Sequence, residues 1–259
     1  MKEDTVENET VLYHREKNVG IITLNRPHCL NAINLDLLKG FMAQLGAAKQ
    51  DTRAKVIILT GKGTSFCAGE DLKETASGKS MEQWMDEAER LQDVQRLTMK
   101  LGKPIIAAIS GYALGGGCEF AMGCDIRIAS DTAVLGFPET TVGMTVTNAG
   151  TKILTHLVGL GKAKELVFTG DFIDAAQAQQ IGLLNKTVPQ EALMAESMAM
   201  AQKIAGRSPL AVSLSRTAID MGMESSFEQT MELEKSHLLM CSQSEVAFVK
   251  KRLREMDGK

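Results

Sequence analysis

The sequence has little of what several classes of protein require. It contains one Trp, two Tyr and five Pro, and its acidic and basic residues nearly balance at a net charge of −3. Such a balance offers no broad basic field for nucleic acid or an anionic membrane. No apolar run approaches the roughly 20 residues of a membrane-spanning helix. The first residues, MKEDTVENET, resemble neither a secretory signal nor an Arg-rich transit peptide. We therefore expect a cytoplasmic protein with no membrane and no nucleic-acid partner.

Metal and disulfide patterns are also missing. The four histidines stand singly, without metal-ligand spacing to one another or to a cysteine. The cysteines are odd in number and show no CxxC spacing: Cys29, Cys67, Cys118, Cys124 and Cys241. We interpret them as reduced thiols of a cytosolic protein, and we expect no metal site.

What is present fits a globular α/β protein. The chain has 259 residues, of which 44 % are hydrophobic and 24 % charged, enough for one large domain or one domain with a smaller appendage. VGIITLN (19–25) and KVIILTG (55–61) are β-branched runs typical of strands. Residues 34–51 between them have apolar positions at helical spacing, which predicts a β-α-β unit.

Further along, 103–111 and 125–130 are predicted strands on either side of a short buried helix. Residues 80–102 predict an amphipathic helix with Ser80 as N-cap. From residue 150 onward the pattern is nearly all helical. We expect an α/β core over residues 1–190 and a C-terminal helical region over residues 191–259.

The stretch GYALGGGCEFAMGCD (111–125) places Glu119 among apolar residues directly after three glycines. It matches neither GxGxxG nor a Walker loop, so a nucleotide phosphate site has little support. Glycines before a short helix leave backbone N–H groups free to face an oxygen that becomes anionic during a reaction. Tight packing of backbone at a turn is the structural alternative.

A second candidate donor loop is GTSFCAGEDLKE (63–74), which leaves the strand at 55–61. Ala68 and Gly69 are small enough for close backbone approach, and ligands often bind where strands of an α/β fold end. Two such loops could converge on one carbonyl oxygen.

Two carboxylates lie in apolar surroundings, Glu119 and, in LGFPETTVG, Glu139. Burial moves carboxyl pKa values up, and two different environments move them apart, as one acid and one base require. Each could instead be a hydrogen-bonded structural carboxylate, and Asp125 is read as structural.

Five segments, taken together and in this order, resemble the crotonase, or enoyl-CoA hydratase/isomerase, family from about residue 10 to residue 255. They are LNRPHCLNAIN (24–34), SFCAGEDLKE (65–74), KPIIAAISGYALGGGCEFAMGCDIRIAS (103–130), FPETTVGM (137–144) and AFVKKR (247–252). The resemblance implies a crotonase-like spiral of β-β-α units with a C-terminal helical trimerisation region, and a homotrimer or hexamer. The fold hosts several chemistries, so the reaction is less specific than the family.

The resemblance also implies an acyl-CoA thioester as substrate, with no cofactor beyond the coenzyme A of that thioester. The N–H groups of Ala68 and Gly116 would form an oxyanion hole, while Glu119 and Glu139 would hold and activate a water. Other substrate-binding positions by the same resemblance are Arg26, Ala32, Gly69, Glu70, Asp71, Leu72, Lys73, Gly115, Thr147, Asn148 and, toward a phosphate, Lys250 or its neighbour Lys251.

The sequence departs from the family after Glu139. Val146, Thr147 and Asn148 stand where the family's fatty-acyl hydratases carry Pro-Gly-Ala. These polar residues suggest a substrate with a polar or cyclic group, or an altered placement of Glu139. Glu70 is an extra acid beside the donor loop, either at a solvated rim or in contact with substrate.

Because both glutamates are present, the predicted activity is hydration of a 2-enoyl-CoA or the reverse dehydration. The alternatives are another crotonase-family reaction on an acyl-CoA, such as double-bond isomerisation, C–C hydrolysis or decarboxylation, and a non-catalytic CoA- or RNA-binding protein.

Overall fold

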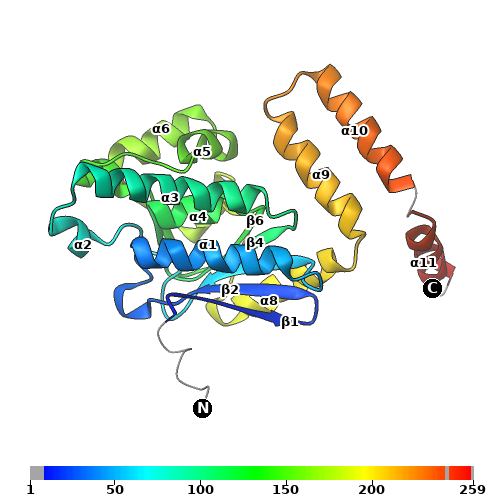
Figure 1. Cartoon of the computed structure of the whole chain (residues 1–259), viewed down its shortest axis with the longest axis horizontal. Coiled ribbons are helices and arrows are strands. Elements are labelled where there is room, and N and C mark those ends of the chain that lie inside the picture. Colours follow the sequence, from blue (N-terminus) through cyan, green and yellow to red (C-terminus); the bar gives the residue numbers. More distant parts are fainter. Residues whose placement is uncertain (1–8, 243–244, 258–259) are drawn as a thin grey trace, which may run out of the picture. The chain divides into compact units, whose positions relative to one another are not determined.

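The computed structural model describes residues 9–242 and 245–257 (Figure 1). They form two compact units, one ending at Gln202 and the other beginning at Lys203. The domain boundary expected after residue 190 lies within the first of these units. The division into two domains at that residue stays a prediction.

A six-stranded sheet forms the centre of the first unit, in the order β1-β2-β3-β4-β6-β9. β1 is antiparallel to β2, and the other neighbouring strands are parallel. The strands are β1 (Val11–Glu16), β2 (Val19–Leu24), β3 (Val56–Gly61), β4 (Ile105–Ile109), β6 (Ile126–Ser130) and β9 (Lys186–Val188). The four predicted strands and the β-α-β unit are confirmed. β1 carries no prediction above, and β9 interrupts the stretch expected to be helical.

Two helices cover one face of this sheet and pack side by side, α1 (Leu35–Gln50) and α3 (Met81–Met99) (Figure 1). Each begins directly after a residue whose side chain caps it, and Ser80 is the predicted cap of α3. The Asn34 side chain accepts a hydrogen bond from the N–H of Leu37, and Ser80 forms a reciprocal capping box with Gln83. Between β3 and α3 the chain makes the short helix α2 (Leu72–Ala76).

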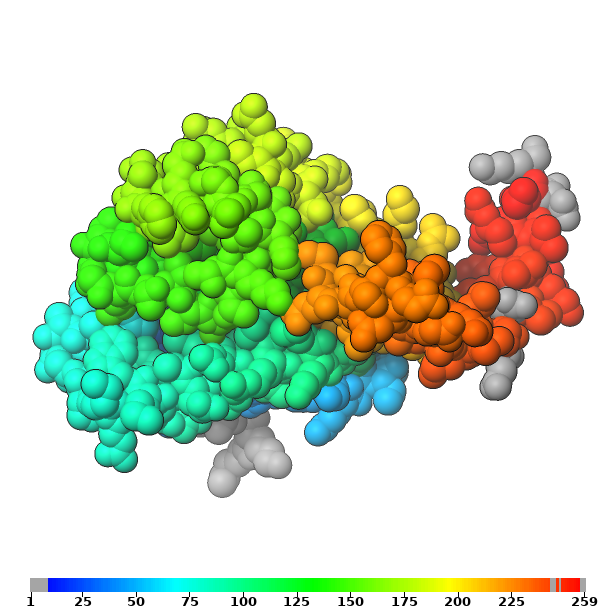
Figure 2. All heavy atoms as spheres, turned by 90° about the horizontal axis from the view of Figure 1, so that it is seen from above, coloured from blue at the N-terminus to red at the C-terminus, as the bar shows by residue number. Residues whose placement is uncertain are grey.

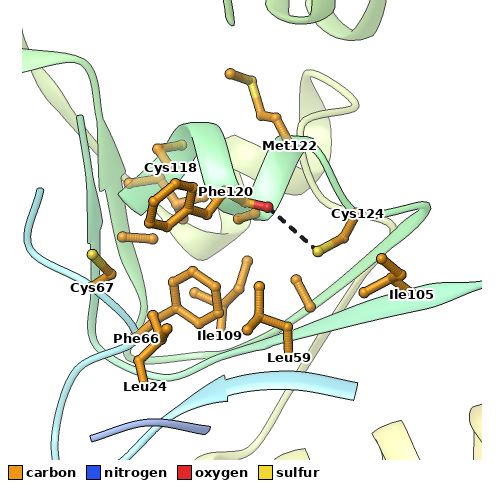
Figure 3. Close-up of a cluster of buried hydrophobic side chains, with 14 of the residues drawn as sticks. Leu24, Leu59, Phe66, Cys67, Ile105, Ile109, Cys118, Phe120, Met122 and Cys124 are labelled. Atoms are coloured by element: carbon orange, nitrogen blue, oxygen red, sulfur yellow. Dashed lines mark hydrogen bonds between the residues drawn. The ribbon is translucent and has the colours of Figure 1, made fainter. Parts of the chain in front are cut away.

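A second, three-stranded sheet has the order β5-β7-β8, from β5 (Tyr112–Leu114), β7 (Val134–Gly136) and β8 (Phe172–Asp174). The predicted short buried helix is α4 (Gly116–Met122), which follows β5 directly. Its apolar side chains, Cys118 and Phe120 among them, join Phe66 and Leu24 in the core (Figure 3). The α4 helix is therefore packed into the core, and Glu119 is buried together with its apolar neighbours.

The rest of the first unit is mostly helical, as expected, apart from β8 and β9. These two strands have three residues each, too few to show an alternating pattern. The remaining elements are η1 (Pro27–Cys29), η2 (Pro138–Val142), α5 (Gly150–Val158), α6 (Leu160–Thr169), α7 (Ala175–Gln180), η3 (Gln190–Ala192) and α8 (Leu193–Ala205), which ends just past Gln202. The segments from α2 to α3 and from η2 to α6 border each other at the surface (cyan to teal and green in Figure 2).

The second unit consists of α9 (Pro209–Gly222), α10 (Phe227–Ser242) and α11 (Glu245–Asp257). Its helical character agrees with the prediction. Within the described part of the chain, no helix is long and apolar enough to cross a membrane. No group of three or more His, Cys, Asp or Glu among those residues could hold a metal ion.

Candidate active site

Glycines bring α4 against the loop that follows β3. Gly115 precedes the helix with a φ of 51°, a left-handed conformation that favours glycine. A Cβ on Gly117 would lie 2.2 Å from the carbonyl oxygen of Cys67, so any side chain there would force the two backbones apart. The structural alternative for these glycines, tight packing, is thus correct, and the packing is what aligns two loops at one place.

Glu119 lies in α4 with 1 % of its surface exposed. Its carboxylate accepts three hydrogen bonds: the N–H of Thr147 donates to Oε1 at 2.5 Å, while Thr147 Oγ1 and Asn148 Nδ2 each donate to Oε2 at 2.9 Å. Gly150 packs closely behind it, because a Cβ there would lie 3.2 Å from Oε1. The loop before α5 therefore holds this carboxylate in one orientation.

Glu139 lies in η2 and is 9 % exposed. Neither of its buried carboxyl oxygens accepts a hydrogen bond from another residue of the described chain. It borders the start of α4, since a Cβ on Gly115 would lie 3.4 Å from Glu139 Oε1. Buried polar atoms normally have partners, so a carboxyl group with none is poised for a water or a ligand.

Burial has the same sign of effect on both acids. Burial raises the pKa of Glu119 to about 7; the Thr147 and Asn148 hydrogen bonds lower it, and the charge of Glu139 raises it. Burial also raises the pKa of Glu139 above its ordinary range. The predicted upward shift of both acids is confirmed, and the two groups are close enough to sense each other.

The thiols nearby are not nucleophiles at neutral pH. Burial raises the pKa of Cys67 to about 12 and also raises that of Cys118. None of the five cysteines forms a disulfide within the described residues.

The loop after β3 corrects one assignment. The Ala68 N–H, predicted as an oxyanion donor, donates to the carbonyl of Leu30 at 3.0 Å and is therefore occupied. Two residues later, the carbonyl of Gly69 accepts from the Ile33 N–H at 2.7 Å, and the Asp71 N–H donates to the Ile33 carbonyl at 2.9 Å. Groups of a trans peptide point in opposite directions. The Glu70 N–H thus points away from Ile33, and it has no partner among the described residues.

The predicted donor in α4 is free. The N–H of Gly116, at the first position of the helix, donates to no group in the described part of the chain, whereas that of Gly115 donates to Gly136. A Cβ on Gly69 would lie 2.7 Å from the carbonyl oxygen of Leu114 and 3.7 Å from Gly115 Cα. The residues that follow these two glycines, Glu70 and Gly116, therefore carry unpaired N–H groups where the two loops meet.

Several predicted substrate-binding residues bind one another instead. Arg26 Nη2 pairs with Asp71 Oδ2 at 3.1 Å, and Arg26 Nη1 donates to the carbonyl of the buried Ala32 at 2.5 Å. Asp71 also caps α2 through the N–H of Glu74. Burial raises the pKa of Asp71, but Arg26 and the cap bonds outweigh it and hold that pKa low. Arg26 thus anchors the donor loop, and its predicted role toward the CoA nucleotide has no support in its contacts.

The other predicted binding residues lie in different surroundings. Leu72 and Lys73 are exposed on α2, next to the donor loop. Glu70 is half-buried, and its carboxylate accepts from Thr75 Oγ1 at 2.7 Å and from Lys79 Nζ at 2.6 Å, so it is not a solvated rim residue. Lys250 is exposed on α11 in the second unit, and its contact with a phosphate stays a prediction.

Thr147 and Asn148 belong to the site, but with another role than the sequence suggested. Their side chains donate to Glu119 rather than presenting all their polar atoms to a substrate. Asn148 and Ala149 have φ values of 51° and 56°, and two left-handed residues in succession turn the loop sharply at this point. These two donors therefore do not favour a polar or cyclic substrate, whereas Asn148 Oδ1 is buried and has no partner among the described residues. Lys79 and Glu87, which meet Glu70, were missed because neither belongs to a motif.

Known proteins resemble the chain along nearly its whole length. The sequence profile described as enoyl-CoA hydratase/isomerase matches residues 14–253. A short-chain-enoyl-CoA hydratase of Clostridium acetobutylicum is 40 % identical over 254 residues, 95 % of this chain and 97 % of that protein. A crotonyl-CoA hydratase of Syntrophomonas wolfei is 38 % identical over 251 residues, 94 % and 96 % of the two chains.

Solved structures agree. The crystal structure of an enoyl-CoA hydratase from Bacillus anthracis superposes with a TM-score of 0.91 at 34 % identity and covers 96 % of both chains. The mixed α/β class, the crotonase fold and the C-terminal helical region are thereby confirmed. The chain belongs to the enoyl-CoA hydratase/isomerase family.

Proposed function

We propose that this protein is a hydro-lyase that adds water across the 2,3 double bond of a short-chain 2-enoyl-CoA, or removes it in reverse. The proposal rests on two buried glutamates that lie beside two unpaired N–H groups. One of them, Glu119, accepts hydrogen bonds, whereas Glu139 accepts none from another described residue. The hydratase names of the relatives at 40 % and 38 % identity support the same reaction.

The two unpaired N–H groups would bind and orient the carbonyl group of the thioester. In our assignment Gly116 and Glu70 donate to its oxygen, with Glu70 replacing Ala68 because the Ala68 N–H is already bonded to Leu30. As water adds to Cβ, negative charge collects on this oxygen. One such donor contributes about 3–4 kcal/mol to the transition state in comparable sites.

The glutamates divide the proton chemistry. Three donors favour the charged form of Glu119, so it acts as the base that takes a proton from water while the oxygen attacks Cβ. No other described residue donates to the Glu139 carboxylate to stabilise a charge, so in our assignment Glu139 carries the proton delivered to Cα. One proton is taken and one is given, and a transfer from Glu119 to Glu139 through water restores the starting state. The reaction so described needs no cofactor beyond the coenzyme A of the substrate.

The chemistry of the loop before α5 favours a plain aliphatic acyl group. Both side-chain donors that the sequence offered to a polar substrate are bonded to Glu119. We also retain the homotrimer or hexamer as a proposal. The oligomer is supported by solvent-exposed apolar residues on α10, where Phe227 is 91 % exposed.

The deciding experiment is a turnover screen over short, long, aromatic, cyclic and dicarboxylic 2-enoyl-CoAs. Hydration of each is measured as the loss of the absorbance of the conjugated thioester. We expect crotonyl-CoA to give the highest kcat/KM. An enzyme that leaves crotonyl-CoA unchanged but converts a 3-enoyl-CoA to its 2-enoyl isomer would refute hydration and establish the isomerase alternative. Preference for a dicarboxylic or cyclic substrate would refute the aliphatic assignment alone.

A further inference from the structure

A buried cluster of charges lies outside the glutamate pair. Lys79 Nζ donates to Glu70 Oε1 at 2.6 Å and to Glu87 Oε2 at 2.5 Å. The side chains of Lys79 and Glu87 are each 6 % exposed, and the ammonium lies 4.7 Å from the centre of the Trp84 ring. Burying three ionisable groups costs free energy unless they are well paired, so the arrangement calls for a role.

Lys79 is poorly placed to bind substrate itself. Two carboxylates and an aromatic ring already occupy its ammonium, and little of its side chain reaches solvent. What it does is join two parts of the chain, the donor loop at Glu70 and the first turns of α3 at Glu87. Around it, α2 and the start of α3 lie at the surface of the first unit (cyan in Figure 2).

The peptide between Gly69 and Glu70 is held from three sides. Its carbonyl accepts from the Ile33 N–H at 2.7 Å. On one flank Asp71 is paired with Arg26 at 3.1 Å. The third restraint on this peptide is the Glu70 side chain, whose carboxylate accepts hydrogen bonds from Lys79 and Thr75. The N–H of this same peptide is the unpaired donor beside Gly116.

We propose that Lys79 is a positioning residue, which fixes the Glu70 N–H toward the thioester oxygen by linking the Glu70 carboxylate to Glu87 on α3. The proposal rests on the proposed function, because it takes the Glu70 N–H as an oxyanion donor. It adds a residue remote from the reacting atoms that sets how strongly the carbonyl is polarised.

The charge balance explains why Lys79 matters more than its neighbours. Without its ammonium, Glu70 and Glu87 face each other as two acids with no cation between them, and the Glu70 carboxylate loses the bond to Lys79 that helps to hold it. Burial and the Glu70 carboxylate raise the pKa of Glu87 to about 7 even with Lys79 present, which shows how poorly the cluster accepts a second negative charge.

The test compares Lys79→Met and Glu87→Gln with the control Lys186→Met, which breaks an exposed pair of the same 2.6 Å length with Glu196. Losing an oxyanion donor outright costs roughly 10²–10³ in kcat, so displacing one should cost less. We expect Lys79→Met to lower kcat for crotonyl-CoA by about 10- to 100-fold, Glu87→Gln by about threefold, and Lys186→Met hardly at all.

Two further readouts separate positioning from a general loss of structure. The first is the dissociation constant of butanoyl-CoA, a saturated thioester that cannot react. It should change less than about threefold, because a hydrogen bond to the neutral carbonyl of this bound thioester is much weaker than the one to the oxyanion of the transition state. The second is the infrared stretch of its ¹³C-labelled thioester carbonyl, which hydrogen bonds from the oxyanion donors lower. In Lys79→Met this band should return part of the way toward its frequency in water.

A Lys79→Met or Glu87→Gln protein that melts like the wild type, with unchanged kcat and an unchanged carbonyl band, would overturn the proposal. If Lys79→Met does not fold, Glu87→Gln alone decides by the same two measurements. If the wild type hydrates no enoyl-CoA, the proposed function fails, while the carbonyl band of bound butanoyl-CoA still reports whether Lys79 orients the donor.

Discussion

Glu119 and Glu139 lie in the same interior but in opposite electrostatic settings. Glu119 accepts three hydrogen bonds, all from Thr147 and Asn148, whereas no other residue that the structure describes donates to the carboxyl oxygens of Glu139. Burial penalises the charge of both. The donors offset that penalty for Glu119 alone. The roles that we propose for the two acids thus depend on the loop before α5, which supplies donors to Glu119 and none to Glu139.

The largest effect should come from Glu119→Gln. An amide cannot take the proton of the attacking water, so we expect kcat for crotonyl-CoA to fall by roughly 10³–10⁴, at the upper end of the range for acid–base residues. The amide also brings donors toward the donors of Asn148 or Thr147. We expect it to destabilise the protein by about 1–3 kcal/mol, measured by urea unfolding.

The matched control is Glu196→Gln, which neutralises an exposed acid paired with Lys186. It should leave both measurements close to wild type. Should Glu119→Gln retain its rate within a few-fold, Glu119 would not be the base, and the contrast between the two acids would have no catalytic meaning.

Glu139→Gln should cost less activity and affect stability in the opposite direction. The amide cannot deliver a proton to Cα, so we expect a loss of roughly 10²–10³ in kcat. A raised folded-state pKa means that the stability penalty appears as pH rises above the ordinary glutamate range. A neutral side chain removes that penalty, so at pH 8 the variant should melt at or above the wild-type temperature. Clear destabilisation at pH 8 would show that Glu139 has a partner as good as those of Glu119.

Much of this comparison could be predicted from the residues. Glu119 and Glu139 were both found from their apolar neighbours, and Gly116 from the glycines before a short helix. These are local signals, in which a polar residue or a flexible backbone breaks an apolar pattern. For the same reason the strands 19–25 and 55–61 and the cap at Ser80 were predicted within a residue or two.

What could not be predicted depends on pairing between distant segments. Ala68 and Glu70 lie on either side of Gly69, and their local sequence does not show which of them has the free N–H. Only the hydrogen bond from the Ala68 N–H to the Leu30 carbonyl leaves Glu70 as the free donor. The direction of the Thr147 and Asn148 side chains depends equally on a left-handed turn and on α4 lying beside it. Lys79 and Glu87 join no motif, and only the fold brings them to Glu70.

Thr147→Val sharpens the comparison by removing one donor while keeping the shape of the side chain. Glu119 must be ionised to act as base, so kcat/KM should fall as pH drops below about 7, the pKa of this group. Losing the hydroxyl donor raises that pKa, by about one unit if the bond contributes some 1.5 kcal/mol. The acidic limb of the profile should therefore move to higher pH, with about a tenfold loss at pH 6. Thr147→Ser retains the hydroxyl and should keep the wild-type profile. A Val variant whose acidic limb stays in place would show that the hydroxyl does not tune Glu119.

The smallest effect should come from Asn148→Gly, which removes the third donor. Glycine is the suitable replacement, because Asn148 has a φ of 51° and alanine there would add backbone strain to the loss of the amide. The Thr147 N–H and hydroxyl remain on Glu119, so we expect the acidic limb to shift in the same direction as in Thr147→Val but by only about half a unit, which lowers kcat/KM about threefold at pH 6. The profile from pH 5.5 to 9 measures both quantities. A larger shift than that of Thr147→Val would make the Asn148 amide the main donor to Glu119, while a shift toward lower pH would contradict the view that these donors stabilise the charged form.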